Sequence, residues 1–186
     1  MNRKILEGVA GIGPTTITGR FQRHTSPRVR SLVGSAAGGR WGPARAYPIL
    51  NLGRPTASVA TEAYRHLVDT VLDGKMTGDL VGPRNLITCH VEIERVLDLR
   101  DPEHLSSVGL TPADLVTEVG DYELCQRVGR AAHQLELAGI LAPAATGLGE
   151  TLAIFERHIQ PSDKLTVLDV QLWSHLPADP RQERSR

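Results

Sequence analysis

Residues 86–99 read Leu-Ile-Thr-Cys-His-Val-Glu-Ile-Glu-Arg-Val-Leu-Asp-Leu, with apolar and polar residues interleaved along the whole stretch. Such interleaving is typical of a β-strand that has one face in the core. Asp101-Pro102 follows and favours an end to the strand, because the residue before a proline is conformationally restricted. The sequence therefore predicts one long strand here, with a helix as the less favoured alternative.

Shorter strands are predicted on both sides of the long one. Before it, β-branched residues are frequent in 15–22, and 47–52 has the length of a short strand. After it, 140–142, 152–158 and 165–172 contain β-branched and alternating residues and are separated by glycine or proline. Because β-branched side chains pack well on a pleated surface, these segments predict a sheet of several strands.

Two amphipathic helices are predicted between the strands. Residues 56–73 place apolar side chains at helical spacing and stop before Gly74. A second such pattern follows Thr111-Pro112 and stops at Gly139. Since strands and helices do not alternate strictly, a doubly wound parallel sheet is disfavoured. The predicted fold class is mixed α/β (α+β), with a mixed sheet flanked by helices.

The length of 186 residues suits one compact domain. Residues 1–13 hold several glycines with little periodicity, which predicts a flexible N-terminal segment. We expect a single domain over residues 14–176. Residues 177–186 are expected to form a polar C-terminal tail.

Composition argues against several classes of function. Lys plus Arg and Asp plus Glu number 21 each, so no net field draws the chain to nucleic acid or to an anionic membrane. Cys89 and Cys125 stand in no metal-ligand spacing, and the histidines form no metalloprotease motif, so no metal site is predicted. No apolar run of about 18 residues and no signal-peptide core occurs, which predicts a cytoplasmic protein that does not bind membranes.

Residues 26–48 are the segment most suited to ligand binding. Glycine and proline are too frequent there for regular structure, and loops longer than about 12–15 residues are often binding loops or lids. Arginines are concentrated in and around this loop, and a guanidinium group binds phosphate oxygens in a bidentate fork. A phosphorylated small molecule is one candidate ligand, although no Rossmann or P-loop motif is present. The alternative is that these arginines are solvated or paired with the chain's own acids.

The order of several motifs resembles the RES domain family. A strand ending at Arg23 precedes Gly38-Gly39-Arg40-Trp41, and a short strand then leads to a helix bearing Glu62. The segments 121–126 (DYELCQ) and 141–145 (LAPAA) are similar to later parts of the family. The resemblance spans roughly residues 20–170.

This resemblance implies an activity and a partner. RES proteins are toxins of bacterial toxin–antitoxin pairs that cleave NAD⁺ at the nicotinamide–ribose bond, by phosphorolysis or hydrolysis, on a fold similar to ADP-ribosyltransferases. It implies NAD⁺ as substrate, inorganic phosphate as an optional co-substrate, no prosthetic group, and a cognate antitoxin of the DNA-binding Xre type. ADP-ribosyl transfer to an acceptor, a non-catalytic nucleotide- or partner-binding variant, and a homodimer stay open as alternatives.

The resemblance also assigns roles to individual residues. Arg23 and Arg40 take positions expected to bind the dinucleotide phosphates or inorganic phosphate, and Arg40 joins Glu62 in the catalytic pair. The Glu62 carboxylate can stabilise the positive charge that develops on the ribosyl carbon as nicotinamide leaves. Helical spacing places Glu62 with His66 and Asp69 on the polar side of its helix, which suits both a cleft and a solvated surface.

Three positions depart from the usual pattern of the family. His24 and Asn51 stand where tyrosines are common, and Glu123 stands where the serine is expected. Asn51 lacks an aromatic surface but keeps an amide that can bond to the substrate. Glu123 either repels phosphate or simply pairs with Arg127 four residues on. All three are candidate binding residues, as is Trp41, for which packing beneath the loop is the favoured role.

Overall fold

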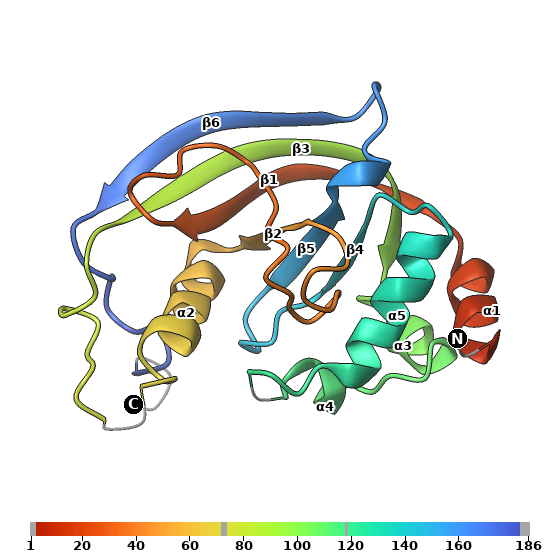
Figure 1. Ribbon diagram of the computed structural model, residues 1–186, viewed down its shortest axis with the longest axis horizontal. Coiled ribbons are helices and arrows are strands. Elements are labelled where there is room, and N and C mark those ends of the chain that lie inside the picture. The colour runs from red at the N-terminus through yellow and green to blue at the C-terminus, as the bar shows by residue number, and fades with distance from the viewer. Residues whose placement is uncertain (1–2, 72–73, 118, 183–186) are drawn as a thin grey trace.

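The computed structural model describes residues 3–71, 74–117 and 119–182, which form one sheet with helices on either side (Figure 1). The strands are β1 (Thr15–Thr25), β2 (Ile49–Arg54), β3 (Arg84–Asp98), β4 (Gly139–Pro143), β5 (Glu150–Phe155) and β6 (Lys164–Trp173). The helices are α1 (Arg3–Ile12), α2 (Thr56–Leu67), α3 (Pro102–Ser107), α4 (Pro112–Leu115) and α5 (Glu123–Gln134), and a 3-10 turn covers Glu156–His158. The predicted mixed sheet flanked by helices is confirmed.

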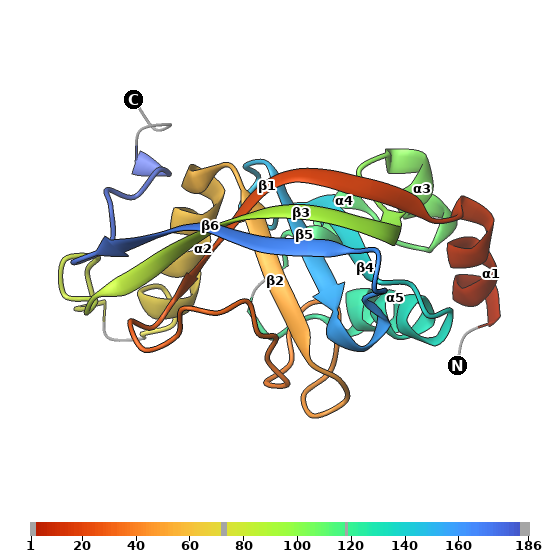
Figure 2. The ribbon, with the colours of Figure 1, turned by 90° about the horizontal axis from the view of Figure 1, so that it is seen from above.

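The long strand β3 organises the sheet, as its sequence pattern indicates. The strand order is β1-β2-β5-β4-β3-β6, and β1 also pairs with β3. Five strands therefore follow one another around a closed ring, and β6 lies outside the ring against β3. The β3–β4 pair is parallel, whereas the other pairs are antiparallel. Seen from above, β2, β4 and β5 cross beneath the arched strands β1, β3 and β6 (Figure 2).

Two apolar clusters stabilise this arrangement. The first fills the inside of the ring with side chains from β1 to β5, among them Phe21, Leu50 and Val91. The second lies between β4, β5 and the helices α1, α3 and α5, and it includes Trp41 from the loop. Because β4 and β5 contribute to both clusters, they are apolar on both faces and form continuous apolar runs. The helices therefore cover one face of a short, fully buried part of the sheet.

The N-terminal segment corrects an expectation. Residues 3–12 form the helix α1 instead of a flexible segment, and Val9 is buried against the helical cluster. Gly8 is a packing residue, because a Cβ atom there would lie 2.2 Å from the carbonyl oxygen of Ser107 in α3. Glycine in this helix thus allows a close approach between two helices, which the sequence pattern alone cannot distinguish from flexibility.

Other helix boundaries also differ from expectation. The helix predicted over 56–73 ends at Leu67, and residues 72–73 lie outside the described part of the chain. The pattern after Thr111 contains two helices, α4 and α5, and α3 was not predicted. In the expected polar tail, Arg181 pairs with Asp69 at 2.6 Å and with Asp179 at 2.7 Å, so the described part of the tail is held to the turn that follows α2. Residues 183–186 lie outside the described residues.

Candidate active site

A cavity of about 600 Å³ opens between α2, the start of α5, the paired strands β1 and β2, and the arginine-rich loop. Of the predicted site residues, all except Glu123 line this cavity: Arg23, His24, Arg40, Trp41, Asn51 and Glu62. These residues come from distant parts of the sequence and meet because α2 packs against β2 and β1, close to the end of β1. The loop over residues 26–48 closes the same side.

Glu123 lies outside the cavity lining, on the surface of α5. Its side chain is 72% exposed and forms an ion pair with Arg127 one helical turn away. Of the two roles considered from the sequence, the geometry matches the surface pair. The neighbouring residue Tyr122 lines the cavity in its place.

The loop that carries Arg40 is fixed to α5. Trp41 is only 2% exposed, and its carbonyl oxygen accepts a hydrogen bond from Tyr47 Oη at 3.2 Å. The backbone at Trp41 also lies very close to Gly129 of α5. Only glycine permits this approach, because a Cβ atom at residue 129 would lie 1.8 Å from the Trp41 carbonyl oxygen. Gln126 Nε2 donates to the carbonyl oxygen of Gly39 at 3.0 Å. Trp41 therefore packs beneath the loop and is also one of the residues that line the cavity.

Arg40 is held in a defined orientation. Its Nη1 donates to the Asp114 carbonyl oxygen at 3.1 Å and to Thr117 Oγ1 at 3.2 Å. The guanidinium carbon lies 4.7 Å from the centre of the Tyr122 ring, a distance typical of a cation–π contact. A guanidinium group carries five N–H donors, so a fixed Arg40 can bind an anion with the donors that these contacts do not use.

Arg23 is the second cation of the cavity. Its Nη1 donates to the Val33 carbonyl oxygen at 2.8 Å, which joins the end of β1 to the loop. Its Nε is buried and has no hydrogen-bond partner among the described residues. Burial lowers the pKa of Arg23, while the charge of Glu156 opposes that change. A buried donor without a partner is costly, so the position of Arg23 is not explained by the hydrogen bonds of this atom.

Each carboxylate oxygen of Glu62 has a basic residue of the same helix beside it, one in a hydrogen bond and one in an ion pair. His66 Nε2 lies 2.9 Å from Oε1, and Arg65 Nη1 lies 3.6 Å from Oε2. Burial on its own would raise the pKa of Glu62, but the hydrogen bond and charge of His66, with the charges of Arg65 and Arg40, bring the pKa below its ordinary value. Glu62 is therefore an anion at neutral pH. Its side chain stays 41% exposed, as a group that faces a cavity requires.

His24 lies beside this group in a neutral form. Burial, followed by the charges of Arg84 and His66, lowers the pKa of His24 to about 4. The Nδ1 atom lies 3.2 Å from Arg84 Nη2, and since arginine only donates, Nδ1 accepts. The proton of the neutral ring is therefore on Nε2. His24 thus offers one uncharged N–H donor.

The low pKa of His24 predicts a loss of stability in acid. Between pH 6.5 and about 4 the unfolded chain binds a proton at His24 that the folded chain does not bind. This group leaves the free energy of unfolding unchanged above that range and lowers it by up to about 3 kcal/mol as the pH falls through it. Urea unfolding of wild type and His24→Gln from about pH 7.5 to about pH 4.5 measures the difference.

We expect a shallower pH dependence for His24→Gln than for wild type. His175→Gln, which removes an exposed histidine outside this cavity, serves as the control and should retain the wild-type slope. Equal slopes for all three proteins would contradict the neutral state of His24.

Several cavity residues were not predicted from the sequence. Tyr122 and Gln126 belong to the segment 121–126 that carries the family resemblance, but their side chains gave no separate signal of a binding role. His66 shares the polar side of α2 with Glu62, and the four-residue spacing between them is the signal that could have identified the contact. Gln22 and Ser58 also line the cavity and were identified only from the structure.

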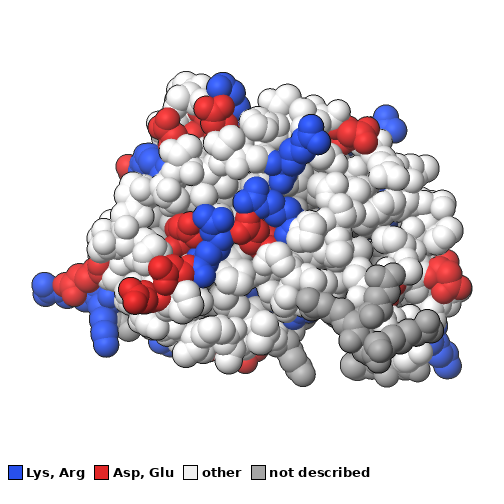
Figure 3. Space-filling view, turned by 180° about the vertical axis from the view of Figure 1, so that it is seen from behind, with Lys and Arg blue, Asp and Glu red and all other residues white. Residues whose placement is uncertain are grey.

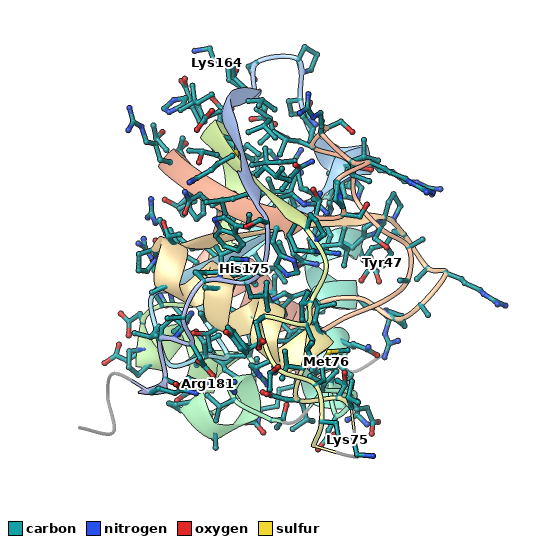
Figure 4. The ribbon with its side chains drawn as sticks, turned by 90° about the vertical axis from the view of Figure 1, so that its left-hand side faces the viewer. Tyr47, Lys75, Met76, Lys164, His175 and Arg181 are labelled. Atoms are coloured by element: carbon teal, nitrogen blue, oxygen red, sulfur yellow. The ribbon has the colours of Figure 1, made fainter. Side chains whose placement is uncertain are left out.

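Other parts of the described surface differ in character from this cavity. The face behind the view of Figure 1 carries basic and acidic side chains next to one another (Figure 3). A second cavity of about 530 Å³ lies between the loop after α2 and the segment after β6, where Met76, His175 and Arg181 are found (Figure 4). No group of three or more His, Cys, Asp or Glu side chains suited to a metal occurs in the part of the chain that the structure describes. Within the same residues, no helix has the length and apolar character needed to cross a membrane.

The fold and the cavity define a class of protein: a mixed α/β domain whose cavity holds two fixed guanidinium groups beside an ionised carboxylate. This composition suits an enzyme that acts on a phosphate-bearing small molecule. The chain belongs to the RES domain family, whose model matches residues 17–175. The family resemblance of the sequence motifs is thereby confirmed.

Known relatives agree with this assignment. The chain is 33% identical over 144 residues to proteins named NAD(+) phosphorylase MbcT from Mycobacterium tuberculosis and Mycobacterium bovis, covering 75% of this chain and 74% of each relative. The fold matches a chain in the crystal structure of the M. tuberculosis MbcT–MbcA toxin–antitoxin complex with a TM-score of 0.80 and 26% identity. That match covers 100% of this chain and 99% of the other.

Proposed function

We propose that this chain is a RES-family toxin that degrades NAD⁺ by cleaving the bond between nicotinamide and ribose. The observation that carries the proposal is that Arg23, Arg40 and Glu62 line one cavity of a chain whose relatives are named NAD(+) phosphorylase. A dinucleotide has two phosphates for the cations and one developing positive charge for the carboxylate. The cavity offers matching groups for each.

Each residue has a role that follows from its charge. Arg40 and Arg23 bind phosphate oxygens, and Arg40 enters the site already oriented by its contacts with Asp114 and Thr117. Glu62 stabilises the oxocarbenium-like transition state, because it is ionised at neutral pH. His24 and Asn51 provide uncharged donors, and Trp41 supports the loop from below.

We further propose inorganic phosphate as the co-substrate. A phosphate oxygen attacks the C1 atom of the ribose, the bond from C1 to the nicotinamide nitrogen breaks, and its electron pair leaves with neutral nicotinamide. The second product is ADP-ribose carrying a new phosphate on C1. Glu123, the residue that would repel phosphate, projects from the surface of α5 instead of the cavity, so it does not oppose this route. The name of the relatives, NAD(+) phosphorylase, supports phosphorolysis over hydrolysis.

Phosphate dependence tests this reaction. We expect NAD⁺ consumption by the purified chain to require phosphate and to release nicotinamide together with phosphorylated ADP-ribose, both quantified by chromatography and mass spectrometry. Equal rates without phosphate, with free ADP-ribose as product, would replace phosphorolysis by hydrolysis. Modified acceptor molecules would indicate ADP-ribosyl transfer, and unchanged NAD⁺ after prolonged incubation would indicate a non-catalytic binding protein.

The partner proposed for this chain is a cognate antitoxin that blocks the cavity. The matching crystal structure is itself that of a toxin–antitoxin complex, MbcT with MbcA. We propose an antitoxin of the Xre type, a cytoplasmic location, where NAD⁺ is present, and a single domain that includes α1 as well as residues 14–176. Light scattering gives the molar mass of the chain with and without its antitoxin, which tests whether the chain forms a homodimer.

A further inference from the structure

Arg40 and Glu62 are connected through a residue that does not line the cavity. Arg40 Nη1 donates to the hydroxyl oxygen of Thr117 at 3.2 Å, and Arg65 Nη2 donates to the carbonyl oxygen of Thr117 at 3.1 Å. Arg65 Nη1 then lies 3.6 Å from Glu62 Oε2. Thr117 therefore contacts Arg40 directly, and it is linked to the Glu62 carboxylate through the side chain of Arg65.

The hydroxyl of Thr117 is suited to hold a cation. It donates to the carbonyl oxygen of Asp121 at 2.8 Å, which uses its single proton. A hydroxyl oxygen has two acceptor sites, and these remain for Arg40. The Asp114 carbonyl oxygen, at 3.1 Å from the same Nη1, provides a second acceptor one helical turn before Thr117. One oxygen in α4 and one just after it thus hold the Nη1 atom of Arg40.

Arg65 is the second arm of this arrangement. Its side chain is 15% exposed, so its charge needs partners inside the protein. The Thr117 carbonyl oxygen and the Glu62 carboxylate are partners on two sides of the same guanidinium group. Arg65 is therefore held by the backbone at Thr117, and its charge acts on Glu62 through an ion pair and not a hydrogen bond.

We propose that Thr117 is a positioning residue that sets the orientation of Arg40 relative to Glu62. The expected effect on NAD⁺ cleavage rests on the proposed function, whereas the effect on the orientation of Arg40 does not. The role concerns the hydroxyl group: the carbonyl oxygen that receives Arg65 is present whatever the side chain. The two arms can therefore be separated by substitution.

Thr117→Val removes the hydroxyl while keeping the shape of the side chain and the carbonyl oxygen, and Thr117→Ser restores the hydroxyl. Because a hydrogen bond to a charged group is lost, we expect Thr117→Val to lower kcat/KM for NAD⁺ by about tenfold. Thr117→Ser should stay within about twofold of wild type. Thermal melting verifies that each variant is folded, and Thr117→Ala replaces the valine variant if that one does not fold.

A double-mutant cycle distinguishes positioning from a general structural role. In an Arg40→Ala background, Thr117→Val should cause no further loss, because the group it orients is gone. A full tenfold loss in that background, or equal losses for Thr117→Val and Thr117→Ser, would overturn the proposal.

A second measurement is independent of NAD⁺ cleavage. Nitrogen-15 NMR of the arginine side chains reports whether the Nη groups of Arg40 are held or rotate freely. We expect resolved, slowly exchanging Nη1 protons for Arg40 in wild type and Thr117→Ser, and their loss in Thr117→Val. A held Arg40 in a chain that leaves NAD⁺ intact would support the positioning role and reject the proposed function. Unchanged signals in Thr117→Val would reject the positioning role alone.

Discussion

Replacing Glu62 by alanine is expected to lower kcat for NAD⁺ cleavage by about 100- to 1,000-fold, because the charge that stabilises the ribosyl cation is removed. Glu62→Gln keeps the size of the side chain and removes its charge, so it should lose nearly as much activity. Neither change removes Arg23 or Arg40. The dissociation constant for NAD⁺ should therefore rise by a much smaller factor than the factor by which kcat falls. Single-turnover rates and calorimetric binding measure the two effects separately.

Glu7→Ala provides the matched control for Glu62. Glu7 is also a helical glutamate paired with a basic residue four positions away, Arg3, but it lies on α1 outside the cavity. This variant should retain wild-type kcat. If Glu62→Gln also retained wild-type kcat, the carboxylate would not be the catalytic group, even though the chain belongs to the RES family.

Removing the guanidinium group of Arg40 is expected to have the second largest effect. Arg40→Ala should lower kcat/KM by about 100-fold, because a fixed, charged donor to phosphate is lost from the cavity. Arg40→Lys should recover little of that loss: an ammonium group is a point charge and cannot bond to Thr117 and a phosphate with the geometry of a fork. The apparent KM values for inorganic phosphate and for NAD⁺ are then measured in the Arg40 variants. The substrate whose KM rises is the one whose phosphate Arg40 binds.

Arg45→Ala is the control for the loss of one positive charge from this loop. Arg45 is exposed and does not line the cavity, so the variant should behave as wild type in both KM values. Arg40→Ala could also act by loosening α4, and thermal melting tests this. An equal loss of activity in Arg45→Ala would show that the net charge of the loop, and not the position of Arg40, governs binding.

Much of the fold followed from local patterns. The interleaved residues of β3 predicted the longest strand, and the irregular segment 26–48 was predicted from its glycines and prolines. The start of α2 at Thr56 was predicted correctly, but its end was not, because the apolar spacing continues past Leu67 while the helix ends there. The helix α1 was missed because Gly8 and Gly11 are typical of loops, whereas the close packing of Gly8 against α3 depends on a neighbour distant in sequence.

The candidate site was likewise predicted in part from the sequence and in part only from the structure. Ordered motifs placed Arg23, Arg40 and Glu62 in one group, and the cavity brings those three together. The same motifs placed Glu123 in the group, but the direction of a side chain at the first turn of α5 depends on how that helix packs on the loop. Gln126 and Tyr122 face the cavity from that turn instead.

Residue types and their order were enough to identify the family, the mixed α/β class and the charged groups that the proposed chemistry needs. These depend on residue identity and order, which local patterns retain. Only the folded chain shows that burial and the charge of Arg40 act on Glu62, that His24 is neutral, and that Arg40 is held by Thr117. Burial and charge at a site depend on which distant segments meet there, and only the folded chain brings those segments within a few ångströms of one another.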